Sequence, residues 1–391
     1  MPNRSVPRRL VLDRSLLHRL MMRRAAPTLA GFFALGLFWG AWASVLPSVQ
    51  RAVGASKGQL GLALLFVTIG SLPAMLLVAG PAVDRFGTRA TAVFCAAFAA
   101  ATVFPARAGS LPLLAVSLFA AGAASGALDV GINAAAARIE HDTGRRLMPL
   151  AHGLYSVGVL TGAVGGGLAR QFGAGREEIL LGVAVLASGA ATWIGGERRA
   201  LGTGSQVRPR LERALIVLGL VGAAAFLIEG ALESWSSIFL ERQLHARPAV
   251  SGLGPGVFAG AMALGRFSGQ LLRFSDRTLL AAGAAVGAAG CALAAAAPSP
   301  PLALVGFALG GAGVSLNAPV VFGAAARGRA NPAAAVATVT TMGYLGLLAA
   351  PPLVGGIAQL ASLRMSFLVL AMVGGGIVVA AARLPLRAAT R

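Results

Sequence analysis

Twelve long stretches of this chain carry almost no charge, and each is close to the length that a helix needs to cross a lipid bilayer, about 20 apolar residues. Backbone groups inside a bilayer must satisfy their own hydrogen bonds, so runs of this kind predict helices. The sequence therefore predicts an all-α integral membrane protein. The expected runs are 27–50, 59–83, 90–106, 111–137, 150–172, 178–196, 214–240, 250–272, 279–297, 302–326, 335–360 and 365–384.

The composition agrees with a membrane protein and excludes other classes. Hydrophobic residues make up 57% of the chain and charged ones 12%, whereas a soluble domain is about a quarter charged. The net charge of +20 comes from basic residues in short groups between the apolar runs, so no nucleic acid partner is expected. Cys95 and Cys291 lie inside apolar runs, which argues against a disulfide framework or a metal site. We expect a monomer whose partners are the lipid bilayer and a small-molecule solute.

A polar interval divides the twelve runs into two sets of six. We predict a basic cytoplasmic tail at 1–26, an N-terminal six-helix bundle at 27–196 and a cytoplasmic linker at 197–213. A C-terminal bundle at 214–385 and a cytoplasmic end at 386–391 follow. A short echo supports duplication, because Asn133 and Asn317 each stand seven residues after a glycine. The two bundles are therefore expected to be pseudo-symmetric.

The distribution of basic residues predicts the orientation. With both termini inside, cytoplasmic segments hold 25 of the 33 basic residues and the opposite side holds 8, as the positive-inside rule requires. The abundance of Ala, Gly and Arg indicates a bacterial gene, hence the cytoplasmic (inner) membrane. Met1–Arg24, with seven arginines, is either a plain cytoplasmic tail or a basic amphipathic helix on an anionic leaflet.

The loop between the second and third runs carries a spaced motif. Its pattern is Gly-x-x-x-Asp-Arg-x-Gly-x-Arg, formed by Gly80, Asp84, Arg85, Gly87 and Arg89. This resembles the signature loop of the major facilitator superfamily, at the matching position of a twelve-helix chain. The glycines allow close packing and a turn, and Asp84 can cap a helix or pair with an arginine. The resemblance implies a conformational latch that breaks as the two bundles rock.

A narrower resemblance runs through most of the chain. The segments 126–137, 152–156, 229–236 and 343–352 resemble the fucose-permease-like branch of that superfamily, whose characterised members are sugar:proton symporters. The resemblance places Asp129 where the sugar permeases carry an acid in the fourth helix. Their second acid, in the first helix, has no counterpart in 38–43, which leaves the solute and the coupling arrangement open.

Three acids lie inside apolar runs: Asp129, Glu229 and Glu233. A carboxylate at membrane depth is costly and is a functional hypothesis by default. Glu229 and Glu233 are four residues apart and share one helical face, where like charges repel. Burial and repulsion both disfavour the charged form. We therefore predict proton coupling at these acids, with a structural hydrogen bond as the alternative for each.

Candidate solute contacts come from polar and aromatic residues inside the runs. An aromatic ring in a midplane cavity can stack on a solute, although core packing would also explain it. The predicted substrate-binding residues are Trp39, Trp42, Asn133, Tyr155, Trp235 and Asn317. The cavity is expected between helices 1, 4, 5, 7, 10 and 11. His152 is expected to make a surface or interhelical bond near the cytoplasmic face.

The resulting prediction is a secondary active transporter that moves a small polar solute, sugar-like or otherwise, by alternating access with proton coupling. The alternative is proton-driven efflux of a drug or metabolite, because Gly158–Gly167 resembles the antiporter motif of drug exporters, with Ala163 in place of its proline. A non-transporting sensor of the same fold is a third possibility. No enzyme chemistry is expected, and no cofactor: without a Walker motif, the proton gradient is the predicted energy source.

Overall fold

A computed structural model describes residues 14–144, 146–195, 212–269, 274–327, 329 and 331–384. All regular secondary structure in these residues is helical, so the all-α prediction is confirmed. The predicted linker, apart from residues 212 and 213, and the predicted C-terminal end lie outside the described residues, as do residues 1–13 of the tail. The tail's second half begins the first helix, α1 (Arg14–Ala52).

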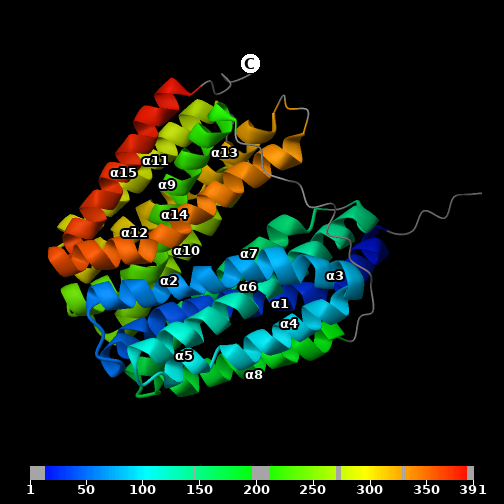
Figure 1. Cartoon of the computed structure of the whole chain (residues 1–391), viewed down its shortest axis with the longest axis horizontal. Helices are drawn as coiled ribbons and strands as arrows, with labels where there is room; N and C mark the ends of the chain where they lie inside the picture. Colours follow the sequence, from blue (N-terminus) through cyan, green and yellow to red (C-terminus); the bar gives the residue numbers. More distant parts are fainter. Residues whose placement is uncertain are drawn as a thin grey trace, which may run out of the picture.

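Two bundles of six spans make up the molecule (Figure 1). The first contains α1, α2 (Lys57–Pro73) with η1 (Ala74–Ala79) and α3 (Gly80–Phe86), α4 (Thr88–Ala101) with α5 (Phe104–Arg107), α6 (Leu111–Thr143), α7 (Met148–Gln171) and α8 (Arg176–Gly195). The second contains α9 (Arg213–Ile238) with η2 (Phe239–Gln243), α10 (Pro248–Gly269), α11 (Asp276–Ala296), α12 (Pro300–Val314) with α13 (Asn317–Ala326), α14 (Pro332–Leu360) and α15 (Leu363–Arg383).

The packing of the two bundles follows the same plan. α1 packs against α7 as α9 packs against α14, α2 against α6 as α10 against α12, and α4 against α8 as α11 against α15. Eleven spans in the described chain are long and apolar enough to cross a bilayer. The one predicted run outside this set, 150–172, corresponds to α7, a helix of 24 residues that carries His152, Arg170 and six glycines. Its close packing on α1 completes the first bundle.

Small residues explain the contact between α1 and α7. A Cβ atom added at Gly40 would collide with the backbone of Val159 and Ala163, and one added at Gly158 would meet the backbone of Phe33 and Leu37. Glycine at such points lets two helix backbones approach closely, which compensates for the missing hydrophobic drive between helices in lipid. The two helices therefore form a tight pair that positions their cavity-facing side chains.

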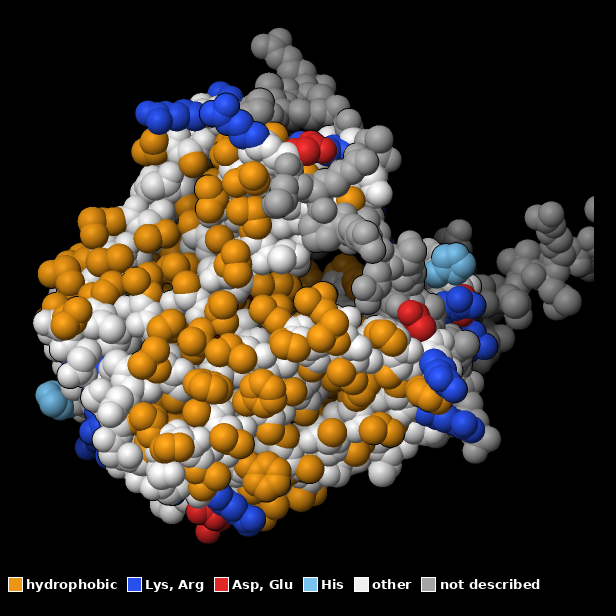
Figure 2. Space-filling model, viewed as in Figure 1, with side chains coloured by type: hydrophobic (Ala, Val, Ile, Leu, Met, Phe, Trp, Pro, Cys, Tyr) orange, Lys and Arg blue, Asp and Glu red, His pale blue; other side chains and the backbone are white. Residues whose placement is uncertain are grey.

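The surface is apolar between two charged ends. Figure 2 shows hydrophobic side chains spread over the viewed face, with charged side chains gathered toward the ends of the helices. Large apolar side chains such as Leu77, Val185 and Met372 are exposed in the absence of lipid. In a bilayer these side chains would face hydrocarbon, which fits the multi-pass membrane prediction.

The two bundles touch at one end and diverge at the other. Contact runs through α2 with α14 and through α7 with α10. A Cβ atom at Gly61 would meet Pro351 and Gly355, and one at Gly167 would meet Pro248 and Gly252. Toward the end that carries α3 and α13 the bundles separate, as Figure 1 shows. The end near Lys57 is called the closed end below.

Candidate transport site

A cavity of about 350 Å³ lies between the bundles. Its lining comes from α1, α2, η1, α6 and α7 of the first bundle and from α9 and α14 of the second. The predicted helices 1, 4, 5, 7 and 11 are all represented, but helix 10 (α12 with α13) is not, and helix 2 takes part. The lining residues are Phe32, Leu35, Trp39, Trp42, Ala43, Leu46, Leu64, Val67, Thr68, Ser71, Met75, Ser125, Gly126, Asp129, His152, Tyr155, Gly230, Glu233, Ser234, Tyr344, Leu347 and Pro351.

Two of the three predicted proton-coupling acids line this cavity, one from each bundle. Asp129 projects from α6, and Glu233 from α9. Asn133, one turn after Asp129, donates its amide N–H to Asp129 Oδ1 at 3.0 Å and to the Asp129 carbonyl at 2.8 Å. Asn133 does not line the cavity. It orients the Asp129 carboxylate, which does.

The third acid, Glu229, has a different environment. It does not line the cavity, and its Oε1 lies 3.4 Å from Arg266 Nη2 of α10. Arg266 lies in the last turn of α10 and pairs with Glu229. The two acids that share a helical face therefore have different surroundings, because Glu229 meets a partner 37 residues along the chain.

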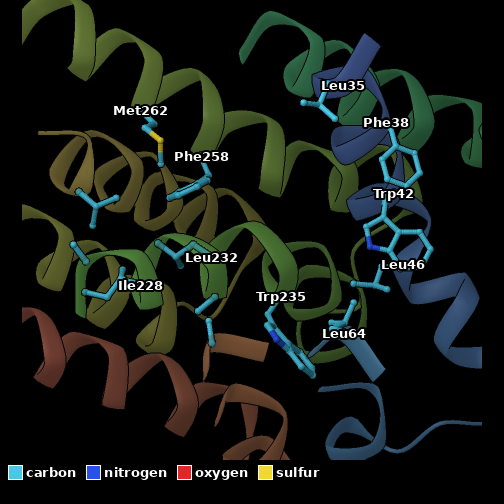
Figure 3. Packing of buried hydrophobic residues seen from close by; sticks show 14 of the residues in the cluster. Leu35, Phe38, Trp42, Leu46, Leu64, Ile228, Leu232, Trp235, Phe258 and Met262 are labelled. Atoms are coloured by element: carbon cyan, nitrogen blue, oxygen red, sulfur yellow. The ribbon is translucent and has the colours of Figure 1, made fainter. Parts of the chain in front are cut away.

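The predicted solute contacts divide into two groups. Trp39, Trp42 and Tyr155 line the cavity. Trp235 and Asn317 have no exposed surface and cannot touch a solute in this conformation. Trp235 lies in the hydrophobic cluster that also contains Leu46 (Figure 3), and its ring lies near the position a Cβ would take at Gly355. Asn317 begins α13, and its side chain faces Gly283 of α11.

Several cavity residues escaped sequence reasoning. Tyr344, Thr68, Ser71, Ser125 and Ser234 all line the cavity. Tyr344 lies inside one of the segments that carry the family resemblance, and that position could have identified it as a candidate cavity residue. The serines and the threonine could not be identified in this way, because both residue types are common in membrane helices. His152 was expected to make a surface or interhelical bond. It lines the cavity, with its ring 5.3 Å from the ring of Phe32.

A buried ion pair joins the bundles at the closed end. Arg170 of α7 makes a two-pronged contact with Glu241 of η2, with both N–O distances 2.9 Å, and the two side chains are only 5% and 8% exposed. Glu241 also accepts from Ser251 at 3.0 Å and lies 3.1 Å from Arg51. Arg170 donates to the Ser44 carbonyl at 2.6 Å.

A hydroxyl makes a further bond between the bundles, since Ser237 donates to the Ala43 carbonyl at 2.6 Å. A bidentate Arg–carboxylate pair is geometrically demanding and strong when shielded from water. The predicted run 214–240 ends just before Glu241, and no local pattern indicated this network. Together these bonds, called the closed-end network below, join the two bundles at the closed end.

The predicted latch residues lie at the opposite end of the molecule. Gly80, Asp84 and Arg85 belong to α3, and Arg89 to the first turn of α4. Gly87 separates these helices with φ 59° and ψ −134°, a conformation that is nearly restricted to glycine. The guanidinium of Arg85 lies 5.3 Å from the ring of Phe86. The latch itself remains a prediction.

Known proteins share this architecture and part of this sequence. The family model for the Major Facilitator Superfamily matches residues 28–267. An uncharacterized MFS-type transporter of Yersinia pestis is 34% identical over 359 residues, covering 87% of this chain and 90% of that protein. The membrane protein MosC of Rhizobium meliloti is 30% identical over 359 residues, covering 88% and 86%.

Solved structures show the same fold at low identity. The nucleoside transporter NupG, in a point-mutant form, superposes with a TM-score of 0.78 at 12% identity, covering 93% of this chain and 100% of that one. The fucose:proton symporter FucP of E. coli, also as a point mutant, superposes with a TM-score of 0.59 at 18% identity, covering 92% and 98%. These structures indicate the fold and not the solute. From the matched family model and the relatives along most of its length, the chain belongs to the Major Facilitator Superfamily, as a membrane transporter and not an enzyme.

Proposed function

We propose that this secondary transporter couples the movement of a small polar solute to the movement of protons, through the cavity between its bundles. The observation that carries the proposal is the pair of carboxyl groups on this cavity, Asp129 from the first bundle and Glu233 from the second. An ionisable side chain facing an intramembrane cavity is a common element of proton relays. Each carboxyl can bind and release a proton as the bundles rock around it.

Asp129 and Glu233 are the main candidates for carrying the proton. The nearby Arg266 compensates the charge of Glu229, so we assign Glu229 a supporting role within the predicted set of three acids. Protonation and solute binding would then favour one rocked state through their differential affinity for the two conformations. No cofactor is required, because the proton gradient supplies the energy.

The names of the structural neighbours bear on the solute. FucP is named a fucose:proton symporter and NupG a nucleoside transporter, which supports a sugar-like solute. Efflux of a drug or metabolite is supported by the glycine-rich face of α7. A sensor of the same fold would need neither carboxyl for its function.

The orientation proposed here follows from the basic residues. With both termini in the cytoplasm, the closed end faces outward and the cavity opens to the cytoplasm, since the bundles diverge toward α3 and α13 (Figure 1). This is an inward-facing state in a bacterial inner membrane. Binding from the other side would require the closed-end network to break.

The test is transport in proteoliposomes that contain a pH-sensitive dye, with sugars, nucleosides and amines added in turn. We expect proton flux that depends on the solute and is lost in both Asp129→Asn and Glu233→Gln. Glu178→Gln, an exposed acid at the closed end that accepts from Gly175 N, is the matched control. Solute uptake that proceeds without proton flux, and is unchanged in both variants, would rule out the proposed coupling.

A further inference from the structure

We propose that the solute is an organic cation: an ammonium group on an apolar, ring-sized body that carries at least one hydrogen-bond acceptor. This inference deepens the proposed function, because it assigns a chemical class to the solute of the same cavity. It stands on three separate observations, namely the acidic groups of the lining, its largely apolar surface, and its aromatic rings.

The ionisable groups of the lining are mostly acidic or neutral. Among the described residues that line the cavity, two are acids, Asp129 and Glu233, and none is a lysine or arginine. The remaining charged groups nearby, Glu229 and Arg266, are paired with each other. The other titratable groups facing the cavity are His152, Tyr155 and Tyr344. An anionic solute would find no counter-ion here, whereas a cation would have two, and electrostatic attraction is strong where water is excluded.

The lining is largely apolar. Most of its side chains are aliphatic or aromatic. Two of its hydroxyls already donate to their own helices, Ser71 to the Thr68 carbonyl at 3.3 Å and Ser125 to the Gly122 carbonyl at 3.0 Å. The aliphatic and aromatic part of the lining therefore matches a solute with an apolar body.

Aromatic rings complete the match to a cation. Trp39, Trp42, Tyr155 and Tyr344 reach the cavity from α1, α7 and α14. The face of such a ring attracts an ammonium group, an effect worth about 0.5–2 kcal/mol that increases with desolvation. The cavity of about 350 Å³ falls within the usual range for small-molecule sites, about 300–1,000 Å³.

The indole N–H of Trp42 suggests why the solute should carry a hydrogen-bond acceptor. Its side chain is only 4% exposed, yet it lines the cavity. Figure 3 shows its indole nitrogen on the side that faces α9. Within the described part of the chain, its N–H has no acceptor among the protein's hydrogen bonds, and a buried indole N–H normally finds one. An ether or carbonyl oxygen on the solute would supply it.

Competition between the cation and protons follows. At low pH the two carboxyls hold protons and His152 gains positive charge, and both changes oppose a cation. As pH rises, the carboxylates and the neutral imidazole favour it. Binding of the cation should therefore tighten with rising pH and release protons, which is the exchange that a cation/proton antiporter needs.

The decisive comparison uses two probes of nearly the same shape. In (2-phenoxyethyl)trimethylammonium a charged nitrogen stands where 3,3-dimethylbutyl phenyl ether has a carbon, and both carry an ether oxygen. Binding to the purified full-length protein would be followed by calorimetry at pH 6 and pH 8. We expect at least tenfold tighter binding of the cation at pH 8, falling toward that of the ether at pH 6.

Variants link this preference to the carboxyls. Glu233→Gln and Asp129→Asn should each remove most of the cation's advantage and leave binding of the ether unchanged. Glu233→Asp, which keeps the charge, should retain part of it, and Glu178→Gln should retain all of it. Thermal unfolding of each variant verifies that it is folded. Equal binding of the two probes, no binding of the cation, or a cation advantage that survives neutralisation of both carboxyls would overturn the inference.

Failure of this inference is separable from failure of the proposed function. A neutral solute that drives proton flux would refute the cation and leave proton coupling in place. Conversely, tight and charge-dependent binding of the cation without any proton flux in proteoliposomes would support the inference and refute the coupling.

Discussion

Two glutamates on one face of α9 differ in what packs against them. Glu229 faces Arg266 of the neighbouring helix, and Glu233 faces the cavity. Their spacing predicts a shared face but says nothing about the partner that each one meets. A paired acid contributes to stability, while an acid in a cavity is available for protons and solute.

This difference gives a prediction about substitution at the two positions. Glu229→Gln leaves Arg266 without its carboxylate and should lower the stability of the folded protein by about 1 kcal/mol, because the pair is only partly shielded from solvent. Glu233→Gln should leave stability nearly unchanged and abolish solute-driven proton flux. Thermal unfolding in detergent measures the first effect and proteoliposome assays the second. The reverse pattern, a destabilised but active Glu233→Gln, would contradict this division.

At this scale the sequence predicted the residue types of the site better than their positions. Asp129, Trp39, Trp42 and Tyr155 line the cavity as expected. Trp235 does not, although it too lies inside an apolar run, because its indole packs inside the core between helices. Helical periodicity places a residue on a face, but which face meets the cavity depends on packing between distant segments.

Among the elements, the α1–α7 pair depends most visibly on glycine. A Cβ at Gly162 would collide with the Leu37 carbonyl and lie 2.7 Å from the Ala41 nitrogen, whereas one at Gly165, on the same helix, meets nothing within 4 Å. One face of α7 therefore requires glycine and another does not. This distinction is invisible in the sequence, where both residues belong to the same glycine-rich motif.

The corresponding prediction compares two single substitutions in α7. Gly162→Ala should destabilise the protein by about 1–3 kcal/mol, the usual cost of overpacking, and should reduce transport by separating α1 from α7. Gly165→Ala should be neutral or slightly stabilising, since alanine favours helix. The midpoints of thermal unfolding decide the matter, and equal midpoints for the two variants would count against close backbone packing at Gly162.

Prolines in the apolar runs show how far helix breaks can be predicted from the sequence. Pro319 predicts a bend in the tenth span, and that span is indeed divided, with α12 ending at Val314 and α13 beginning at Asn317. A proline is tolerated in the first turn of a helix because no earlier carbonyl needs its missing N–H. The break therefore lies just before the proline, in the segment that also buries Asn317. Pro351 and Pro352, by contrast, lie inside the continuous α14.

The closed-end network supports a prediction about conformational balance. Glu241→Gln removes the charge that Arg170 and Arg51 share and should weaken the seal between the bundles. A cysteine introduced in place of Ala43, which is 3% exposed, should then react faster with an impermeant maleimide added from the closed-end side. The native Cys95 and Cys291 are buried and should add little background.

The control for this experiment is Glu178→Gln, which removes an acid at the same end of the molecule without touching the network. Its labelling rate should match that of the parent protein. If Glu241→Gln labels no faster than this control, the ion pair is not what holds the closed end shut, and contacts such as those of Gly61 and Gly167 suffice.

For the whole molecule, the sequence predicted the architecture but not the conformational state. Run length and the polar interval indicated two sets of six helices, and the helices pack according to that plan. Which end is closed could not be predicted, because it depends on contacts such as Arg170 with Glu241, which join residues 71 positions apart. Local sequence patterns predict the helices, whereas long-range contacts determine which end of the molecule is closed.

The sidedness of the molecule yields a last prediction, which can be tested at the two ends of α6. Gly109 precedes this helix at the closed end, where a Cβ would meet no atom within 4 Å, and His141 near its other end has a side chain 82% exposed. The excess of basic residues on the α3 side argues that this side faces the cytoplasm. In spheroplasts, an impermeant maleimide should therefore label Gly109→Cys and spare His141→Cys, and inverted vesicles should give the opposite result.

Because the cavity opens toward the His141 end, Ser234→Cys should be labelled in inverted vesicles. Labelling of Ser234→Cys only in spheroplasts would mean that the outward-facing state predominates in the membrane, while reversal of the two α6 positions would invert the proposed topology.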